Sequence, residues 1–212
     1  MLNSRRGFSK VFFVVALVAI IMVALFFVKN LSKSNGNFTN IKPMYGAEDY
    51  KSYIANRSEE IKKIDETFVR SALSQKNLVD ATDGIFGGAL SYIEKDPKDF
   101  DTAMKRCNQV WLLDHERYTA YLCFGMILRE KGDSSQAQTY FLRAAERANE
   151  NLKDVTIDET NRERITYSLI YIYMELGKYE EARKLLNSGN IKDVKLKAQL
   201  REMDATLKIK GF

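Results

Sequence analysis

The chain has 212 residues, of which 45% are hydrophobic and 29% charged, and it contains only two prolines. This length suits one membrane segment and one modest domain, and the scarcity of proline favours a helical fold. The net charge of +5 falls to +2 once Arg5, Arg6 and Lys10 are set aside, since 30 basic and 28 acidic side chains remain. No basic stripe with interleaved aromatic residues is present, so we expect no nucleic-acid partner.

Residues 11–28 (VFFVVALVAIIMVALFFV) form an uninterrupted apolar run. At about 1.5 Å per residue the run would span roughly 27 Å, close to the thickness of the hydrocarbon layer of a membrane. A cleaved signal peptide is the alternative, but its apolar region is shorter and ends at a small-residue cleavage site. No such site follows residue 28, so the sequence predicts a transmembrane signal anchor.

The basic residues before the run predict that residues 1–10 lie in the cytoplasm, by the positive-inside rule. The C-terminal domain would then lie outside the cytoplasm, and a bacterial inner membrane with a periplasmic domain is the setting we favour. Residues 29–46 are rich in Asn, Ser, Lys and Gly, which predicts a linker.

Residues 47–77 show helical periodicity, with Ile61, Ile64 and Phe68 on one face. A short coiled coil would explain this amphipathic helix. We favour a helix whose apolar face packs on the first repeat. The stretch NLVDATDG at residues 77–84 then predicts a break.

Two later segments share one pattern. In LREKGDSSQAQTYFL (128–142) and YMELGKYEEARKLL (173–186), an apolar helical stretch ends at a glycine, and an alanine follows five residues later. These glycine and alanine positions resemble the tetratricopeptide repeat, a helical hairpin of about 34 residues. The matching repeat positions are Tyr121, Phe124, Gly125, Gly132, Ala137, Phe141, Leu169, Tyr173, Gly177, Ala182 and Leu186.

The resemblance implies an all-α solenoid of three repeats. The expected repeats are residues 84–117, 118–151 and 163–196, within a region spanning 84–196, and the first is degenerate but has Ala103 at the correct spacing before Ala137. We expect residues 194–209 to form a capping helix, because solenoids need a closing element at the open end.

The two glycines Gly132 and Gly177 are 45 residues apart, which leaves 11 residues more than one repeat. Eleven residues are about three helical turns. We therefore predict longer helices around residues 150–164, forming an extended hairpin arm, with a capping box from Thr156 to Glu159.

No catalytic motif, phosphate-binding loop or metal-ligand spacing is present, and the chain has a single histidine, His115, in a polar turn. We therefore expect no enzymatic activity, no cofactor and no metal. The two cysteines, Cys107 and Cys123, would lie on neighbouring helices. A disulfide is possible there in an oxidising compartment, and two buried free thiols are the interpretation that we favour.

In the tetratricopeptide family the first helix of each repeat lines a concave groove that binds protein partners. By that resemblance the predicted groove residues are Tyr92, Leu122, Met126, Arg129, Arg164, Tyr167, Tyr171 and Met174. Tyr, Met and Arg are enriched at protein interfaces, although residues at these positions also fill helical cores.

These features predict a membrane-anchored scaffold or adaptor that binds other proteins, such as subunits of membrane or envelope complexes. One alternative is a structural subunit of a secretion, pilus or flagellar assembly. Another is an accessory protein that binds cell-wall glycan through the tyrosines. The sequence names neither the partner nor the oligomeric state.

Overall fold

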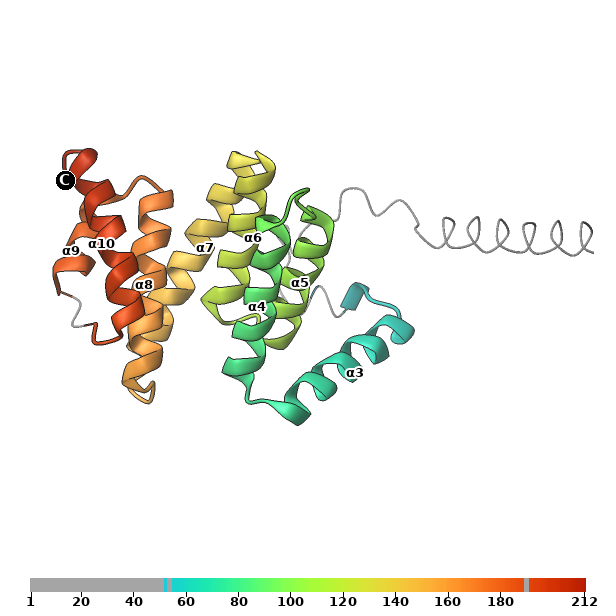
Figure 1. The fold of residues 1–212 in the computed structure, drawn as a ribbon. Coiled ribbons are helices and arrows are strands. Elements are labelled where there is room, and N and C mark those ends of the chain that lie inside the picture. The colour runs from blue at the N-terminus through green and yellow to red at the C-terminus, as the bar shows by residue number, and fades with distance from the viewer. Residues whose placement is uncertain (1–51, 53–54, 189–190) are drawn as a thin grey trace, which may run out of the picture. The chain divides into compact units, whose positions relative to one another are not determined.

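The computed structural model describes residue 52, residues 55–188 and residues 191–212, which all belong to a single compact unit. Eight α-helices lie wholly within these residues, which include no strand, so the all-α class is confirmed (Figure 1). The predicted N-terminus (1–10), membrane anchor (11–28) and linker (29–46) lie outside the described residues. Of the helices described, none is both long and apolar enough to cross a bilayer.

The helices pack as successive hairpins, α4 with α5, α6 with α7, and α8 with α9, and α10 then packs on α8 and α9 (Figure 1). Side-chain caps define most of their starts: the residue before the first turn accepts a hydrogen bond from a backbone N–H inside it. The helices are α3 (Glu59–Gln75), α4 (Leu78–Glu94), α5 (Phe100–Leu113), α6 (Tyr118–Lys131), α7 (Ser134–Lys153), α8 (Glu159–Glu175), α9 (Tyr179–Ser188) and α10 (Val194–Ile209).

The bounds of two hairpins differ from those of the predicted repeats. The first hairpin begins at Leu78 rather than at residue 84, because Asn77 caps α4 and most of the predicted break is helical. The third hairpin begins at Glu159 rather than at residue 163 and ends at Ser188. The closing helix α10 spans the residues expected for it.

The helix α3 is shorter than the predicted 47–77 and packs less closely than expected. It approaches α4 and α5, but none of its residues is buried. Ile61 and Ile64 are 37% and 61% exposed. The expected burial of its apolar face on the first hairpin is therefore slight.

The core is centred on α6, which is buried on almost all sides and carries ten buried residues. Gly125 allows α7 to approach closely, since a Cβ atom at this position would lie 2.8 Å from ring carbons of Phe141. The glycines that end α6 and α8, Gly132 and Gly177, have φ angles of +90° and +70°. Side chains other than glycine rarely adopt that left-handed conformation.

The surplus residues lie in longer helices. α7 has 20 residues and α8 has 17, whereas α5 and α6 have 14 each. The predicted capping box at Thr156 is wrong, because Thr156 donates its hydroxyl to Asp154. Asp158 caps α8 instead, and its carboxylate accepts the Asn161 N–H at 2.8 Å.

This lengthening changes how the first helices of the hairpins meet. α4 packs on α6 and α8 packs on α10, but α8 packs on α7 rather than on α6 (Figure 1). The core is divided accordingly. One apolar cluster extends from α4 to α8, and a smaller one is formed by residues of α8, α9, α10 and the α9–α10 connection.

Candidate functional site

The predicted groove residues of α8 form one stripe along the helix. Arg164, Tyr167, Tyr171 and Met174 are spaced three or four residues apart, so they share a face. Arg164 is exposed and the other three are partly buried. Tyr171 packs against the cluster centred on α6, whereas Tyr167 and Met174 pack against the cluster beside α10.

The predicted groove residues of α4 and α6 are less uniform. Tyr92 and Met126 are half-buried against the main core. Leu122 is only 4% exposed, so it belongs to the core and is not available to a partner. Its assignment to the groove is therefore corrected.

The side chain of Arg129 links α6 to α8, two helices whose backbones do not pack directly on each other. Its guanidinium donates to the Tyr171 hydroxyl at 2.8 Å and to the Glu175 carboxylate. It also donates to Glu130 at 2.9 Å, and Glu130 in turn accepts from Lys98 at 2.7 Å. This network connects the α4–α5 turn, α6 and α8.

Burial governs the electrostatics of this network. It raises the pKa of the Tyr171 phenol, an effect that Glu175 strengthens and Arg129 opposes. Hydrogen bonds from Lys98 and Arg129 lower the pKa of the Glu130 carboxyl. At neutral pH the network therefore holds a neutral Tyr171 phenol and an ionised Glu130 carboxylate. The guanidinium of Arg129 thus already donates hydrogen bonds to groups within the fold.

At the opposite end of α8, Arg164 reaches α4. Its guanidinium donates to the Asp83 carboxylate at 3.0 Å, although the two residues are 81 positions apart in the chain. The Arg164 side chain remains 48% exposed. Arg164 is thus the predicted groove cation that is most open to a partner.

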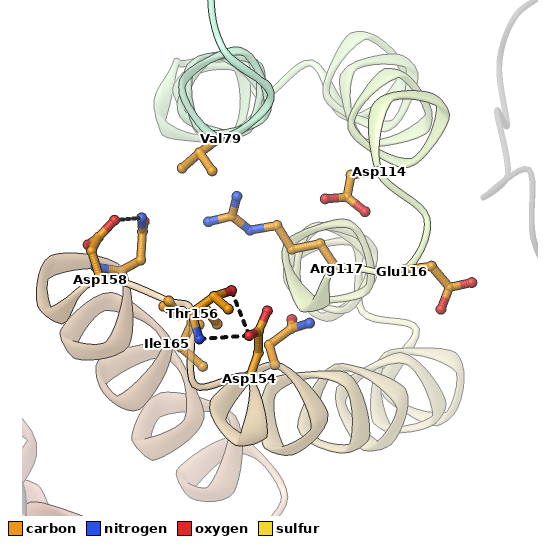
Figure 2. Close-up of a pocket in the computed structure, with 11 residues that line it drawn as sticks. Val79, Asp114, Glu116, Arg117, Asp154, Thr156, Asp158 and Ile165 are labelled. Carbon is orange, nitrogen blue, oxygen red and sulfur yellow. Dashed lines mark hydrogen bonds between the residues drawn. The ribbon is translucent and has the colours of Figure 1, made fainter.

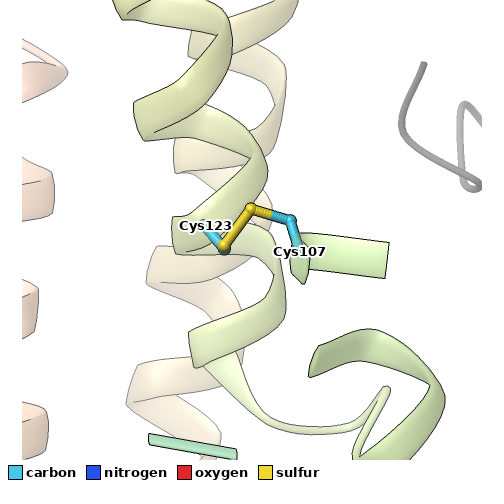
Figure 3. Close-up of a disulfide and its surroundings, with 2 residues drawn as sticks. All are labelled: Cys107 and Cys123. Carbon is cyan, nitrogen blue, oxygen red and sulfur yellow. A yellow bond between two sulfur atoms is a disulfide. The ribbon is translucent and has the colours of Figure 1, made fainter. Parts of the chain in front are cut away.

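The two cysteines are joined in a disulfide that links α5 to α6 (Figure 3). Their Cα atoms are 5.4 Å apart, and both residues are fully buried. The structure therefore differs from the favoured interpretation of two free thiols. The sequence spacing placed the two cysteines on neighbouring helices but could not decide whether their side chains face each other.

The sequence analysis did not identify Glu163, a buried carboxylate on α8. Its oxygens accept the backbone N–H groups of Lys192 at 2.8 Å and of Asp193 at 3.1 Å, immediately before α10. The side chain thereby fixes the closing helix to the last hairpin. A glutamate within a polar stretch of sequence gives no signal of such a role.

No family model, curated protein or solved structure matches this chain.

Proposed function

We propose that this chain is a membrane-anchored scaffold or adaptor whose extracytoplasmic domain binds other proteins through the α8 stripe formed by Arg164, Tyr167, Tyr171 and Met174. The observation that carries the proposal is this stripe. It combines one exposed arginine with three partly exposed side chains of types that are enriched at protein interfaces. No reaction is proposed for it.

We also propose that α4 to α9 are three repeats of the tetratricopeptide type. The positive φ angles of Gly132 and Gly177, at the ends of first helices, support this assignment. So does the burial of Ala103, Ala137 and Ala182, which are 0%, 2% and 0% exposed on the second helices. In such repeats the first helices face a partner, and α8 is the first helix of the third hairpin.

The disulfide supports the proposed location outside the cytoplasm. Disulfides persist in oxidising compartments and are rare where cellular thiols are kept reduced. The apolar run at residues 11–28 would hold the domain at the membrane, and the basic residues before it would keep the N-terminus in the cytoplasm.

Site-specific photocrosslinking in the full chain, in native membranes, tests the stripe. We expect a crosslinker at Tyr167 or Met174 to capture a protein partner, and Arg164→Ala to abolish that adduct. Lys184→Ala on the exposed side of α9 is the matched control and should leave the adduct unchanged. An adduct that survives Arg164→Ala contradicts a role for this arginine in binding.

The second candidate is a structural subunit of an envelope assembly, joined through the outer surface. Two exposed apolar side chains favour it: Leu142 on α7 is 43% exposed, and Val155 at the tip of the α7–α8 turn is 90% exposed. Crosslinkers at these two positions would then form adducts, whereas those on the stripe would form none.

A further inference from the structure

A cavity of about 450 Å³ opens where the α5–α6 turn, the α7–α8 turn and the first turn of α4 meet (Figure 2). Polar residues of the two turns and an apolar wall of Val79, Ile157 and Ile165 line it. The long α7–α8 arm supplies one side of the cavity. None of the eight residues of the predicted groove belongs to its lining.

Arg117 supplies the positive charge of the cavity lining. Figure 2 shows its side chain extending from the start of α6 toward Val79 and Asp158. The side chain is 11% exposed, and its closest carboxylate oxygen, on Asp83, is 3.9 Å away. Among the described residues the guanidinium forms no hydrogen bond; its other direct contact is with the ring of Tyr118, 5.9 Å from the ring centroid. A mostly buried guanidinium with one long ion pair and no hydrogen bond has its charge only weakly compensated.

The acidic side chains near Arg117 are already engaged by other groups. Asp83 accepts a hydrogen bond from Arg164, and Glu116 pairs with Arg147 at 2.6 Å. Both carboxylates thus form ion pairs with arginines that do not line the cavity.

The three remaining acidic residues of the lining are held by their own turns. Asp154 accepts from Thr156, and Asp158 accepts from Asn161. Burial raises the pKa of Asp114, while the charge of Arg117 and hydrogen bonds from the backbone at Glu116 and Arg117 oppose that shift. Arg117 is thus the cationic residue of the lining, and its guanidinium donors form no hydrogen bond with the described residues.

We propose that the cavity binds a carboxylate carried on a short aliphatic group, with the guanidinium of Arg117 as its anchor. The planar fork of arginine matches a carboxylate with two parallel hydrogen bonds. The wall of Val79, Ile157 and Ile165 suits the aliphatic part. A phosphate dianion fits less well, because the carboxylates of the lining repel its larger negative charge more strongly than that of a single carboxylate.

Two sources offer this chemistry, a free short-chain acid and the glutamate side chain of another protein. Butyrate represents the first source and a peptide with one glutamate and blocked ends represents the second. Broadening of their proton NMR lines on addition of the full chain in detergent reports weak binding. Butylamine and inorganic phosphate are the comparison ligands, at matched ionic strength.

The unmodified chain should bind butyrate, the peptide or both, and should bind butylamine and phosphate at least about tenfold more weakly. Arg117→Ala should weaken carboxylate binding by at least about tenfold, and Arg117→Lys should restore only part of it. Arg201→Ala, which removes an exposed arginine of α10, is the matched control. Binding of butyrate alone identifies a free acid as the ligand, and binding of the peptide alone identifies a protein side chain.

Three results would overturn the proposal. They are the absence of carboxylate binding to the unmodified chain, equal or tighter binding of butylamine or phosphate, and unchanged binding by Arg117→Ala. The comparison among ligands on the unmodified chain needs no substitution, so it remains decisive even if Arg117→Ala fails to fold. The butyrate assay needs no protein partner and leaves the α8 stripe unmodified, so failure of one proposal does not imply failure of the other.

Discussion

The ring of Phe141 on α7 lies directly over Gly125 on α6, so that a methyl group at Gly125 would be 2.8 Å from two ring carbons. We expect Gly125→Ala to destabilise the fold by about 1 to 3 kcal/mol, because the ring must move within a packed core. Thermal unfolding followed by circular dichroism measures this change. The same substitution at Gly87, within α4, has open space around its Cβ. Gly87→Ala should therefore stabilise the protein by about 0.5 to 1 kcal/mol, and equal losses at both sites would contradict this packing.

Two buried tyrosine hydroxyls make a matched pair. The Tyr121 hydroxyl donates to the His115 carbonyl at 2.9 Å, whereas the buried Tyr140 hydroxyl has no hydrogen-bond partner among the described residues. Tyr121→Phe should cost about 0.5 to 1.5 kcal/mol, and Tyr140→Phe should cost nothing or stabilise the fold. Denaturant unfolding of the two variants distinguishes them. A larger loss at Tyr140 than at Tyr121 would refute this assignment.

The buried Tyr140 phenol should also make the fold less stable at alkaline pH. Burial raises the pKa of its phenol to about 12, whereas an unfolded chain ionises tyrosine near about 10. Between these pH values the unfolded state loses the proton that the folded state keeps, so stability falls as the pH rises. Melting temperatures from pH 9 to pH 12 should fall less steeply for Tyr140→Phe than for the unmodified chain. Parallel curves would contradict the raised pKa.

The disulfide closes a loop across a sequence separation of 16 residues. Replacing both Cys107 and Cys123 by alanine should lower the free energy of unfolding by about 3 kcal/mol, mainly because the unfolded chain regains freedom. Because both residues are fully buried, reductant should act slowly on the folded protein. A thiol-specific mass label, added together with the reductant to the folded protein, measures this rate. The double variant, which has no thiol, is the control, and rapid labelling of the folded chain would contradict the observed burial.

Glu163 should control the attachment of α10. Glu163→Ala removes the acceptor of two backbone N–H groups before that helix. We expect faster hydrogen exchange in residues 194–209 with little change in α6. Glu159→Ala is the matched control, since it removes only an ion pair with Lys192 in which both side chains are more than 60% exposed. Unchanged exchange in Glu163→Ala would show that other contacts hold α10.

Local sequence patterns predicted those features that depend on neighbouring residues, such as the turn glycines and the small buried alanines. The turn glycines Gly132 and Gly177 could be located because a helical stretch ends there in a left-handed conformation. The small residue Ala137 was recognised from its spacing, and it is buried as expected. Helix starts were less certain, because Thr156 and Asp158 are both capping residues two positions apart. The bond between Thr156 and Asp154 decides between them.

Long-range side-chain pairs could not be predicted in the same way. Arg164 meets Asp83 across 81 positions, and Arg129 meets Tyr171 across 42. These contacts depend on how far α8 stands from α6, which is set by the lengths of the helices between them. The environment of Arg117 follows from the same separation, so a single arginine in a turn gave no sign of it.

The extra length of α7 and α8 acts as a spacer between the second and third hairpins. Relative to α5 and α6, α7 is longer by six residues and α8 by three, which is about two and a half turns together. The distance along the chain between Gly132 and Gly177 increases accordingly. A repeat array with such a spacer can increase the distance between two hairpins without changing the core. Removing whole turns from both helices should therefore narrow the space around Arg117, whereas removing half a turn should rotate buried side chains into water.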